Sequence, residues 1–222
     1  MIPLGVLASA RVAAVSGYDS LVLASSPAAY WRLNEASGAS TAIDSSGNSR
    51  NLSYLAGRQS GAAMGSGLST SSTGRIVGTY SIEWLDGLSS TFTVEMVAQL
   101  TGTVGGWVDL VAFRTLGWSV NTGPEGTSIQ FAFHHGQWRD AIYSGFGTSA
   151  RHIVAVLDPS GHRLYVDGAL AGEVVRDNEI LSGSQDIFVI GLDTQALISD
   201  VAIYPTALSP STIAAHYAAA GI

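Results

Sequence analysis

The sequence predicts an all-β protein: an antiparallel β-sandwich of the jelly-roll type with one short C-terminal helix. Short runs rich in Val, Ile, Thr, Phe and Tyr recur between clusters of Gly, Asn, Asp and Ser. Several runs alternate apolar and polar residues with the period of two that places one set of side chains in a core. The runs also follow one another too closely for the long helical crossovers that parallel sheets need.

The strand pattern recurs along most of the chain. The predicted strands are residues 28–33, 75–80, 91–100, 107–113, 116–121, 127–134, 138–143, 151–157, 162–167, 169–175, 186–191 and 197–204. In the third of these, Phe92, Val94 and Met96 alternate with polar residues, so they are expected to face the core. Residues 151–157 are apolar on both faces, which predicts a central strand covered on both sides.

The stretch YVDG predicts a hairpin between two of these strands. Asp167 and Gly168 separate two apolar patterns, and a two-residue turn needs positive φ at both positions. Glycine adopts that geometry freely and aspartate tolerates it. We therefore interpret Asp167 as a turn residue and not as a catalytic or metal-binding carboxylate.

Only the end of the chain has a helical pattern. Ser209 suits an N-cap, Pro210 the first helical position and Gly221 the C-terminal stop. Ile213 and Tyr217 fall on one side, so we expect them to pack on the sandwich.

The composition excludes two classes of partner. The chain has 17 acidic and 10 basic residues, all of the latter arginine, and a net charge of −7. Without a basic patch no nucleic-acid partner is expected. No stretch approaches the roughly 20 apolar residues that cross a bilayer, so no membrane partner is expected either. Cysteine is absent, which excludes disulfides and thiol nucleophiles.

Three stretches together resemble a known family. They are YDSLVLASSPAAYWRLNEASGASTAIDSSGNSRNLSY at residues 18–54, GHRLYVDGALAGE at residues 161–173 and ISDVAIYPTALSPSTIAAHYAAAG at residues 198–221. They resemble the opening, the central hairpin and the closing strand and helix of laminin-G-like, concanavalin A-like jelly rolls. The resemblance implies that this domain spans residues 18–222, behind an N-terminal arm of residues 1–17.

One position departs from the family pattern. Members usually carry a tryptophan followed by histidine before the central strand, whereas this chain has Ser149 and Ala150 there and retains His152. The departure weakens the case for a family ligand site beside that strand. We expect His152 to be a hydrogen-bonded histidine of the sheet and not a ligand.

The fold leaves several functions open, because such domains occur in adhesion modules, glycosidases and viral structural proteins. One domain behind an apolar arm, in a lysine-free and alanine-rich chain, resembles the minor tail proteins of phages that infect actinobacteria. This implies a structural virion protein that assembles with other tail subunits and with itself and contacts host-surface glycans. The alternatives are a carbohydrate-binding adhesion module of a secreted protein and, third, a glycoside hydrolase.

Catalysis is not expected from the spacing of the acidic residues. A retaining glycosidase needs two carboxyl groups about 5 Å apart. Glu83 and Asp86 are three residues apart and so on opposite faces of an ideal strand, and Glu95 stands alone. The serines lie in polar stretches without a GxSxG elbow. We therefore expect no enzyme.

No cofactor or metal site is predicted either. His134 and His135 are adjacent, so in a strand they point to opposite faces and cannot share an ion. Asp109 and Asp140 are candidate calcium ligands, but no acidic loop accompanies them, and calcium at the rim remains open.

The segment FHHGQWRDAIY is the strongest candidate for a glycan site. Sugars are held by an aromatic ring against their apolar face and by polar groups at their hydroxyls. The candidate residues are His135, Trp138, Arg139, Asp140 and Tyr143, with Trp118 as an extension. The alternative is that Trp138 and Tyr143 serve packing and that Arg139 pairs with Asp140.

The N-terminal arm is a candidate for assembly. Its apolar residues have no place in a complete jelly roll and could add a strand to a sheet edge of another subunit. These residues are Leu4, Val6, Leu7, Val12 and Val15.

Overall fold

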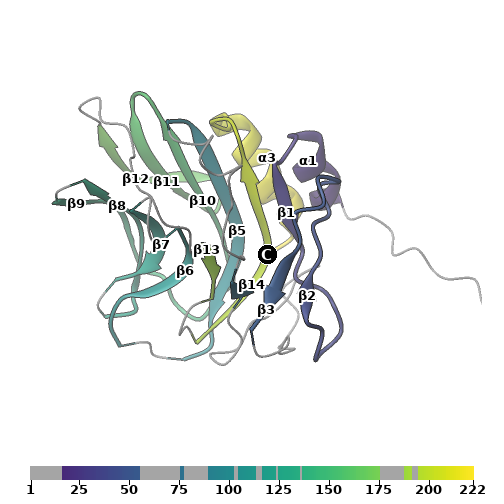
Figure 1. Cartoon of the computed structure of the whole chain (residues 1–222). Coiled ribbons are helices and arrows are strands. Elements are labelled where there is room, and N and C mark those ends of the chain that lie inside the picture. Colours follow the sequence, from purple (N-terminus) through teal and green to yellow (C-terminus); the bar gives the residue numbers. More distant parts are fainter. Residues whose placement is uncertain are drawn as a thin grey trace, which may run out of the picture.

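Two antiparallel sheets pack face to face in the protein, as the sequence predicts (Figure 1). The computed structural model describes residues 17–55, 76–77, 90–102, 105–113, 117–123, 125–135, 137–175, 188–191 and 195–222. The predicted assembly arm, with Leu4, Val6, Leu7, Val12 and Val15, lies outside the described residues. Neither described helix is long and apolar enough to cross a membrane.

The first sheet has six strands and contains both the opening and the closing strand of the domain. In spatial order it consists of β1 (Ala29–Trp31), β14 (Ala196–Tyr204), β5 (Phe92–Leu100), β10 (Arg151–Asp158), β11 (Gly161–Val166) and β12 (Ala169–Val175). Ala29 pairs with Ile203, so the end of the chain returns to lie beside its beginning.

The second sheet has eight strands. In spatial order it consists of β2 (Thr41–Ala42), β3 (Leu52–Tyr54), β4 (Ile76–Val77), β13 (Phe188–Ile190), β6 (Val108–Phe113), β7 (Trp118–Thr122), β8 (Ser128–His135) and β9 (Gln137–Ser144). Consecutive strands β6 to β9 form a meander, which the alternating pattern and the short connections favour.

The core fills the space between the sheets. Phe92, Val94 and Met96 of β5 are buried there, as predicted. The prediction that β10 is covered on both sides is also confirmed. Its Ala155 faces the inter-sheet core, whereas Val156 packs with Ile213 of the C-terminal helix.

Two helices, α1 (Gly17–Ala24) and α3 (Pro210–Ala220), lie together on the outer face of the six-stranded sheet (Figure 1). Helix α3 begins as predicted, because the Ser209 hydroxyl accepts a hydrogen bond from the backbone N–H of Thr212, and it ends at Gly221 with a φ of +68°. Of its predicted contacts Ile213 is fully buried, whereas Tyr217 is only partly buried.

The prediction that only the C-terminus is helical is wrong, since α1 precedes the first strand. Its Leu21 and Leu23 are exposed while Tyr18 and Val22 are buried. Apolar residues therefore occur on both sides of the helix, and the sequence lacks the one-sided pattern that indicates an amphipathic helix. Contacts with α3 and the sheet hold α1 in place.

The hairpin between β11 and β12 turns at the predicted residues. Asp167 and Gly168 have φ values of +52° and +76°. The Asp167 carboxylate also accepts hydrogen bonds from Arg151 Nη1 at 2.6 Å and from the backbone N–H of His152 at 3.1 Å. Asp167 is therefore a structural residue that ties the turn to β10.

Candidate functional site

A hollow of about 560 Å³ lies on the outer face of the eight-stranded sheet. Ala112 of β6, Ser119 of β7 and Ala132 of β8 pair with one another across the sheet, and Asp140 of β9 continues the row. All four line the hollow. Because three of these side chains are small, they rise only a short way above the sheet and leave room for a ligand.

A second row lies two residues along β7 and β8, and therefore on the same face; on β6 a bulge makes the offset three residues. It places Asp109, Asn121 and Gln130 side by side. The residues between the rows, such as Val120, point into the core. The hollow thus combines a floor of small side chains with a border of carboxylate and amide groups.

Trp107, which precedes β6, also lines the hollow and is 58% exposed. A tryptophan buries 150–250 Å² when it is covered, so leaving this much of it in water forgoes a large apolar contribution. Exposed rings beside polar groups are typical of ligand sites.

Several acceptor atoms in and beside the hollow have no partner. Asn121 is only 5% exposed and its Nδ2 donates to Ser119 Oγ at 2.6 Å. Its Oδ1, Gln130 Oε1 and Asp140 Oδ1 are buried, and none of them accepts a hydrogen bond within the described structure. Burial raises the pKa of Asp140. Such acceptors are costly when they are left unpaired and favour a ligand that donates hydrogen bonds.

The arrangement of the acidic residues does not favour a metal. Asp109 and Asp140 lie on β6 and β9, with two strands between them. Three inter-strand spacings of about 4.8 Å separate them by roughly 14 Å, too far to share an ion. Across the described residues, no three His, Cys, Asp or Glu side chains gather where a metal could bind.

The structure divides the predicted glycan residues between the two faces of β9. Asp140 lines the hollow. Arg139 and Tyr143 pair with Phe133 and Ile129, which are core residues, so they project from the opposite face to Asp140. Both Arg139 and Asp140 are described, and no ion pair joins them. The side chains of His135 and Trp138 lie outside the described part of the structure, although the two residues belong to β8 and β9.

Trp118 does not provide the predicted aromatic platform. It borders the hollow, but it is 3% exposed and its ring lies 5.1 Å from the ring of Phe92 in the core. The exposed aromatic residue is Trp107 instead, which sequence reasoning assigned to a strand and overlooked. The pair Gly105-Gly106 directly before it was the available signal, because a glycine turn often presents the next side chain to solvent.

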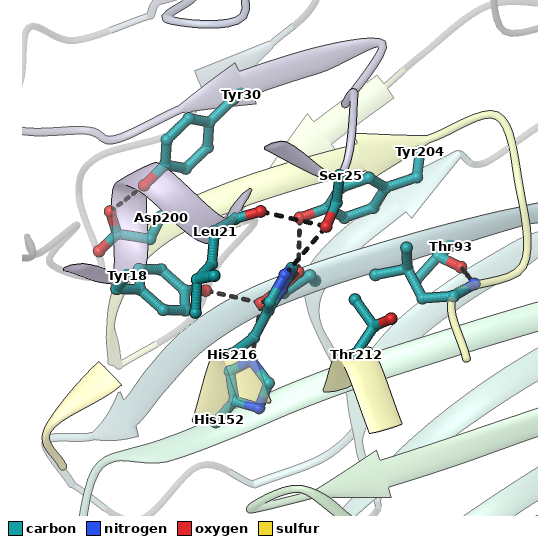
Figure 2. A network of polar contacts seen from close by, with 12 residues as sticks. Tyr18, Leu21, Ser25, Tyr30, Thr93, His152, Asp200, Tyr204, Thr212 and His216 are labelled. Atoms are coloured by element: carbon teal, nitrogen blue, oxygen red, sulfur yellow. Dashed lines mark hydrogen bonds and ion pairs between the residues drawn. The ribbon is translucent and has the colours of Figure 1, made fainter. Parts of the chain in front are cut away.

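A second group of polar side chains lies on the other side of the molecule, between the two helices and the six-stranded sheet (Figure 2). Its centre is Glu95 of β5, which is fully buried. Glu95 accepts hydrogen bonds from Tyr18 at 2.9 Å, His152 Nε2 at 2.8 Å, Tyr204 at 2.6 Å and His216 Nδ1 at 3.0 Å. These partners are all donors and come from four separate elements of the chain. The expectation that His152 is a hydrogen-bonded sheet histidine is confirmed.

The hydrogen bonds keep Glu95 ionised. Burial by itself would raise the pKa of Glu95, but its hydrogen bonds with His152 and His216 hold it well below the ordinary value. His152 Nδ1 is buried without a hydrogen-bond partner in the described structure, so its contact with Glu95 is made through Nε2 alone.

The Ser25 hydroxyl completes this set and gives it the spacing of a serine triad. Its Oγ lies 3.1 Å from His216 Nε2 and donates to the Leu21 carbonyl at 3.1 Å. A hydroxyl that donates its one hydrogen to this carbonyl does not donate it to His216, so Ser25 is not arranged for activation by that ring. The backbone N–H groups of Ser25 and Ser26 bond to carbonyls of α1, so neither of them is available to stabilise an oxyanion.

A sequence-family comparison matches residues 77–214, more than half of the chain. The chain belongs to the concanavalin A-like lectin/glucanases superfamily. The match covers the hollow and most of the sandwich, and it confirms the resemblance to laminin-G-like, concanavalin A-like jelly rolls. A comparison with curated protein sequences gives no match.

Solved structures with the same fold include toxin and sialidase domains. The binding domain of botulinum neurotoxin DC in complex with SialylT superposes with a TM-score of 0.70 at 12% identity, over 90% of this chain and 52% of that one. Botulinum neurotoxin type C, whose cell entry depends on two ganglioside molecules, gives 0.69 at 13% identity over 90% and 52%. Trypanosoma rangeli sialidase in complex with sialic acid gives 0.64 at 14% identity over 85% and 32%.

These likenesses concern the fold, because the identities are low. This chain spans about half the length of the toxin domains and about a third of the length of the sialidase.

Proposed function

We propose that this protein is a non-catalytic carbohydrate-binding protein that holds a glycan in the hollow on the eight-stranded sheet. The observation that carries the proposal is the exposed ring of Trp107 beside a floor of small residues. The ring covers the apolar face of a sugar, while the acceptors of Asn121 and Asp140 take hydrogen bonds from its hydroxyls.

The fold relatives support the choice of ligand class. The neurotoxin structures involve gangliosides and SialylT, and the sialidase holds sialic acid. In those proteins the fold accompanies glycan recognition, and the same class of ligand suits the polar and aromatic lining of the hollow here.

Two features support binding without hydrolysis. Asp109 and Asp140 belong to strands three inter-strand spacings apart, roughly 14 Å between their backbones, whereas glycosidases place their two carboxyl groups about 5–9.5 Å apart. In the Ser25–His216–Glu95 set the serine hydroxyl donates to a backbone carbonyl, and the backbone N–H groups of Ser25 and Ser26 are already bonded to carbonyls of α1.

The setting that we propose is the virion of a phage, in which the protein is a minor tail component attached through its N-terminal arm to other tail subunits or to further copies of itself. The apolar arm and the lysine-free, alanine-rich composition support this setting. Detection of the protein in purified virions tests it. Its absence there, together with secretion from a cell, would favour the alternative of a secreted adhesion module.

A glycan array followed by titration calorimetry tests the binding function. Trp107→Ala is expected to weaken the best array ligand about tenfold, which corresponds to the roughly 1.4 kcal/mol that a stacked ring contributes. Leu170→Ala is the matched control, because Leu170 is 52% exposed on β12 and lies away from the hollow. Equal affinities of the two variants would place the glycan elsewhere. Release of reducing ends from any bound oligosaccharide would refute the non-catalytic part.

A further inference from the structure

Asp140 is the acidic residue on the floor of the hollow. None of the lining residues within the described part of the chain carries a cationic side chain. Arg139 directly precedes Asp140 in the sequence, but its side chain projects from the other face of β9. The nearest arginine in sequence therefore does not neutralise the hollow.

Asp140 is the carboxylate that most needs a partner. Its Oδ1 is buried and accepts no hydrogen bond, and the residue forms no ion pair within the described structure. Burial without a compensating charge disfavours the ionised form, which is the cause of its raised pKa. A ligand that brings a positive charge to Asp140 removes this penalty.

The neighbouring acceptors add a requirement for donated hydrogen bonds. Asn121 is only 5% exposed, and its Oδ1 accepts no hydrogen bond in the described structure. Gln130 pairs with Asn121 from β8, and its buried Oε1 likewise accepts no hydrogen bond in the described structure. A ligand carboxylate or sulfate would face repulsion from Asp140 and would leave these acceptors unpaired.

We propose that the hollow selects glycans that carry a free, protonated amine, such as glucosamine residues, and that Asp140 contacts the amine. The inference rests on the proposed function of the hollow as a glycan site. It separates this protein from its fold relatives that bind sialic acid, an anionic sugar, because the residues here attract the opposite charge.

The test uses the full chain and two tetrasaccharides of the same length: β-1,4-linked glucosamine and its fully N-acetylated counterpart. Titration at about pH 6.5 keeps an amine charged, because ordinary amines of this type have a pKa of roughly 7.7. The amine form is expected to bind about tenfold more tightly, as a charge-assisted hydrogen bond predicts. The preference is expected to shrink when salt is raised, because screening weakens the attraction.

Asp140→Asn is expected to abolish the preference, leaving the two tetrasaccharides about equal. Glu173→Gln removes the same charge from an exposed residue of β12 and is expected to leave the preference unchanged. Equal binding of both sugars by the unmodified protein, or a preference that survives in Asp140→Asn, would overturn the inference while the glycan function stands. Absence of binding to any oligosaccharide on an array would instead overturn the proposed function itself.

Discussion

Replacement of Asp200 by asparagine should change the way in which stability depends on pH. Asp200 is 2% exposed at the bulge of β14, and its φ of +54° suits asparagine as well as aspartate. The Tyr30 hydroxyl lies 2.9 Å from Asp200 Oδ1 (Figure 2) and 2.7 Å from Asp19 Oδ1. Its single hydrogen cannot serve both carboxyl groups.

The ion pair of Asp19 decides which group receives the hydrogen. Asp19 pairs with Arg32 Nη2 at 2.8 Å and is therefore ionised, so the Tyr30 hydroxyl donates to it. Asp200 is best accommodated as the protonated acid, which donates to the oxygen of Tyr30. Burial raises the pKa of Asp200 to about 6 from the ordinary 3.8.

The difference between these two pKa values corresponds to about 3 kcal/mol. At pH values between 3.8 and about 6, Asp200 keeps its proton in the folded protein but has lost it in the unfolded chain. The contribution of Asp200 to stability is therefore complete below about pH 4 and is lost as the pH rises through about 6. Asparagine donates from Nδ2 at every pH and should remove this loss.

Urea unfolding at pH 4 and pH 8 measures the effect, with the free energy of unfolding extrapolated to water. At each pH the free energy of unfolding of the unmodified protein is subtracted from that of Asp200→Asn. This difference should be about 3 kcal/mol larger at pH 8 than at pH 4. Asp44→Asn provides the contrast. Although Asp44 is partly buried, the backbone N–H groups of Tyr30 and Arg50 hold its pKa below the ordinary value. The stability that Asp44 contributes is lost only as the pH falls below the ordinary 3.8, so Asp44→Asn should destabilise about equally at pH 8 and at pH 4. A difference between Asp200→Asn and the unmodified protein that does not change with pH would refute the proton assignment.

Two further substitutions test the packing of the six-stranded sheet. Glu95→Gln replaces a buried carboxylate that two tyrosines and two histidines contact with an amide whose NH2 group cannot accept from them, so it should cost about 3–5 kcal/mol in urea unfolding. Glu173→Gln, in an exposed pair with Arg163, should cost less than about 1 kcal/mol, and similar losses in the two variants would contradict the central role of Glu95. Gly172→Ala would bring a Cβ to 2.7 Å from the Ile142 backbone nitrogen, where β12 meets β9, and should lower the free energy of unfolding by about 1–3 kcal/mol. Gly147→Ala meets nothing within 4 Å, and a comparable loss there would show that the cost at Gly172 is not steric.

The architecture could be predicted because its causes are local. Alternation assigned Phe92, Val94 and Met96 to the core, and the turn requirement identified Asp167 and Gly168. The β2 and β3 strands were missed because they have only two and three residues, too few for a period of two to be recognised.

The sites could not be predicted because their causes are long-range. The floor of the hollow joins Ala112, Ser119, Ala132 and Asp140 from four strands, and their alignment depends on the register of three strand pairs. A register change of one residue would have moved each side chain to the other face. The bulge between Asp109 and Val111 is one such change, and no residue type in that stretch announces it.

The buried group around Glu95 left a weak signal that sequence reasoning did not combine. Glu95 and His216 are each the only ionisable residue in an otherwise apolar stretch, and His152, directly after Arg151, begins the apolar run of β10. A charged residue in such a stretch is expected to have a partner, since burying it alone is costly. Three such residues of opposite charge could therefore have been predicted to meet, although 57 and 121 positions separate the two histidines from Glu95.

The two polar regions differ in a way that bears on function. On the helix-covered face the Glu95 carboxylate receives donors from two tyrosines and two histidines, so its charge is already compensated by the protein. On the open face Asn121 Oδ1, Gln130 Oε1 and Asp140 Oδ1 remain unpaired in the described structure beside the exposed ring of Trp107. Since buried acceptors in native proteins are nearly always paired, the second arrangement is the one that a ligand would complete. This difference is the physical reason to look for the glycan on the eight-stranded sheet.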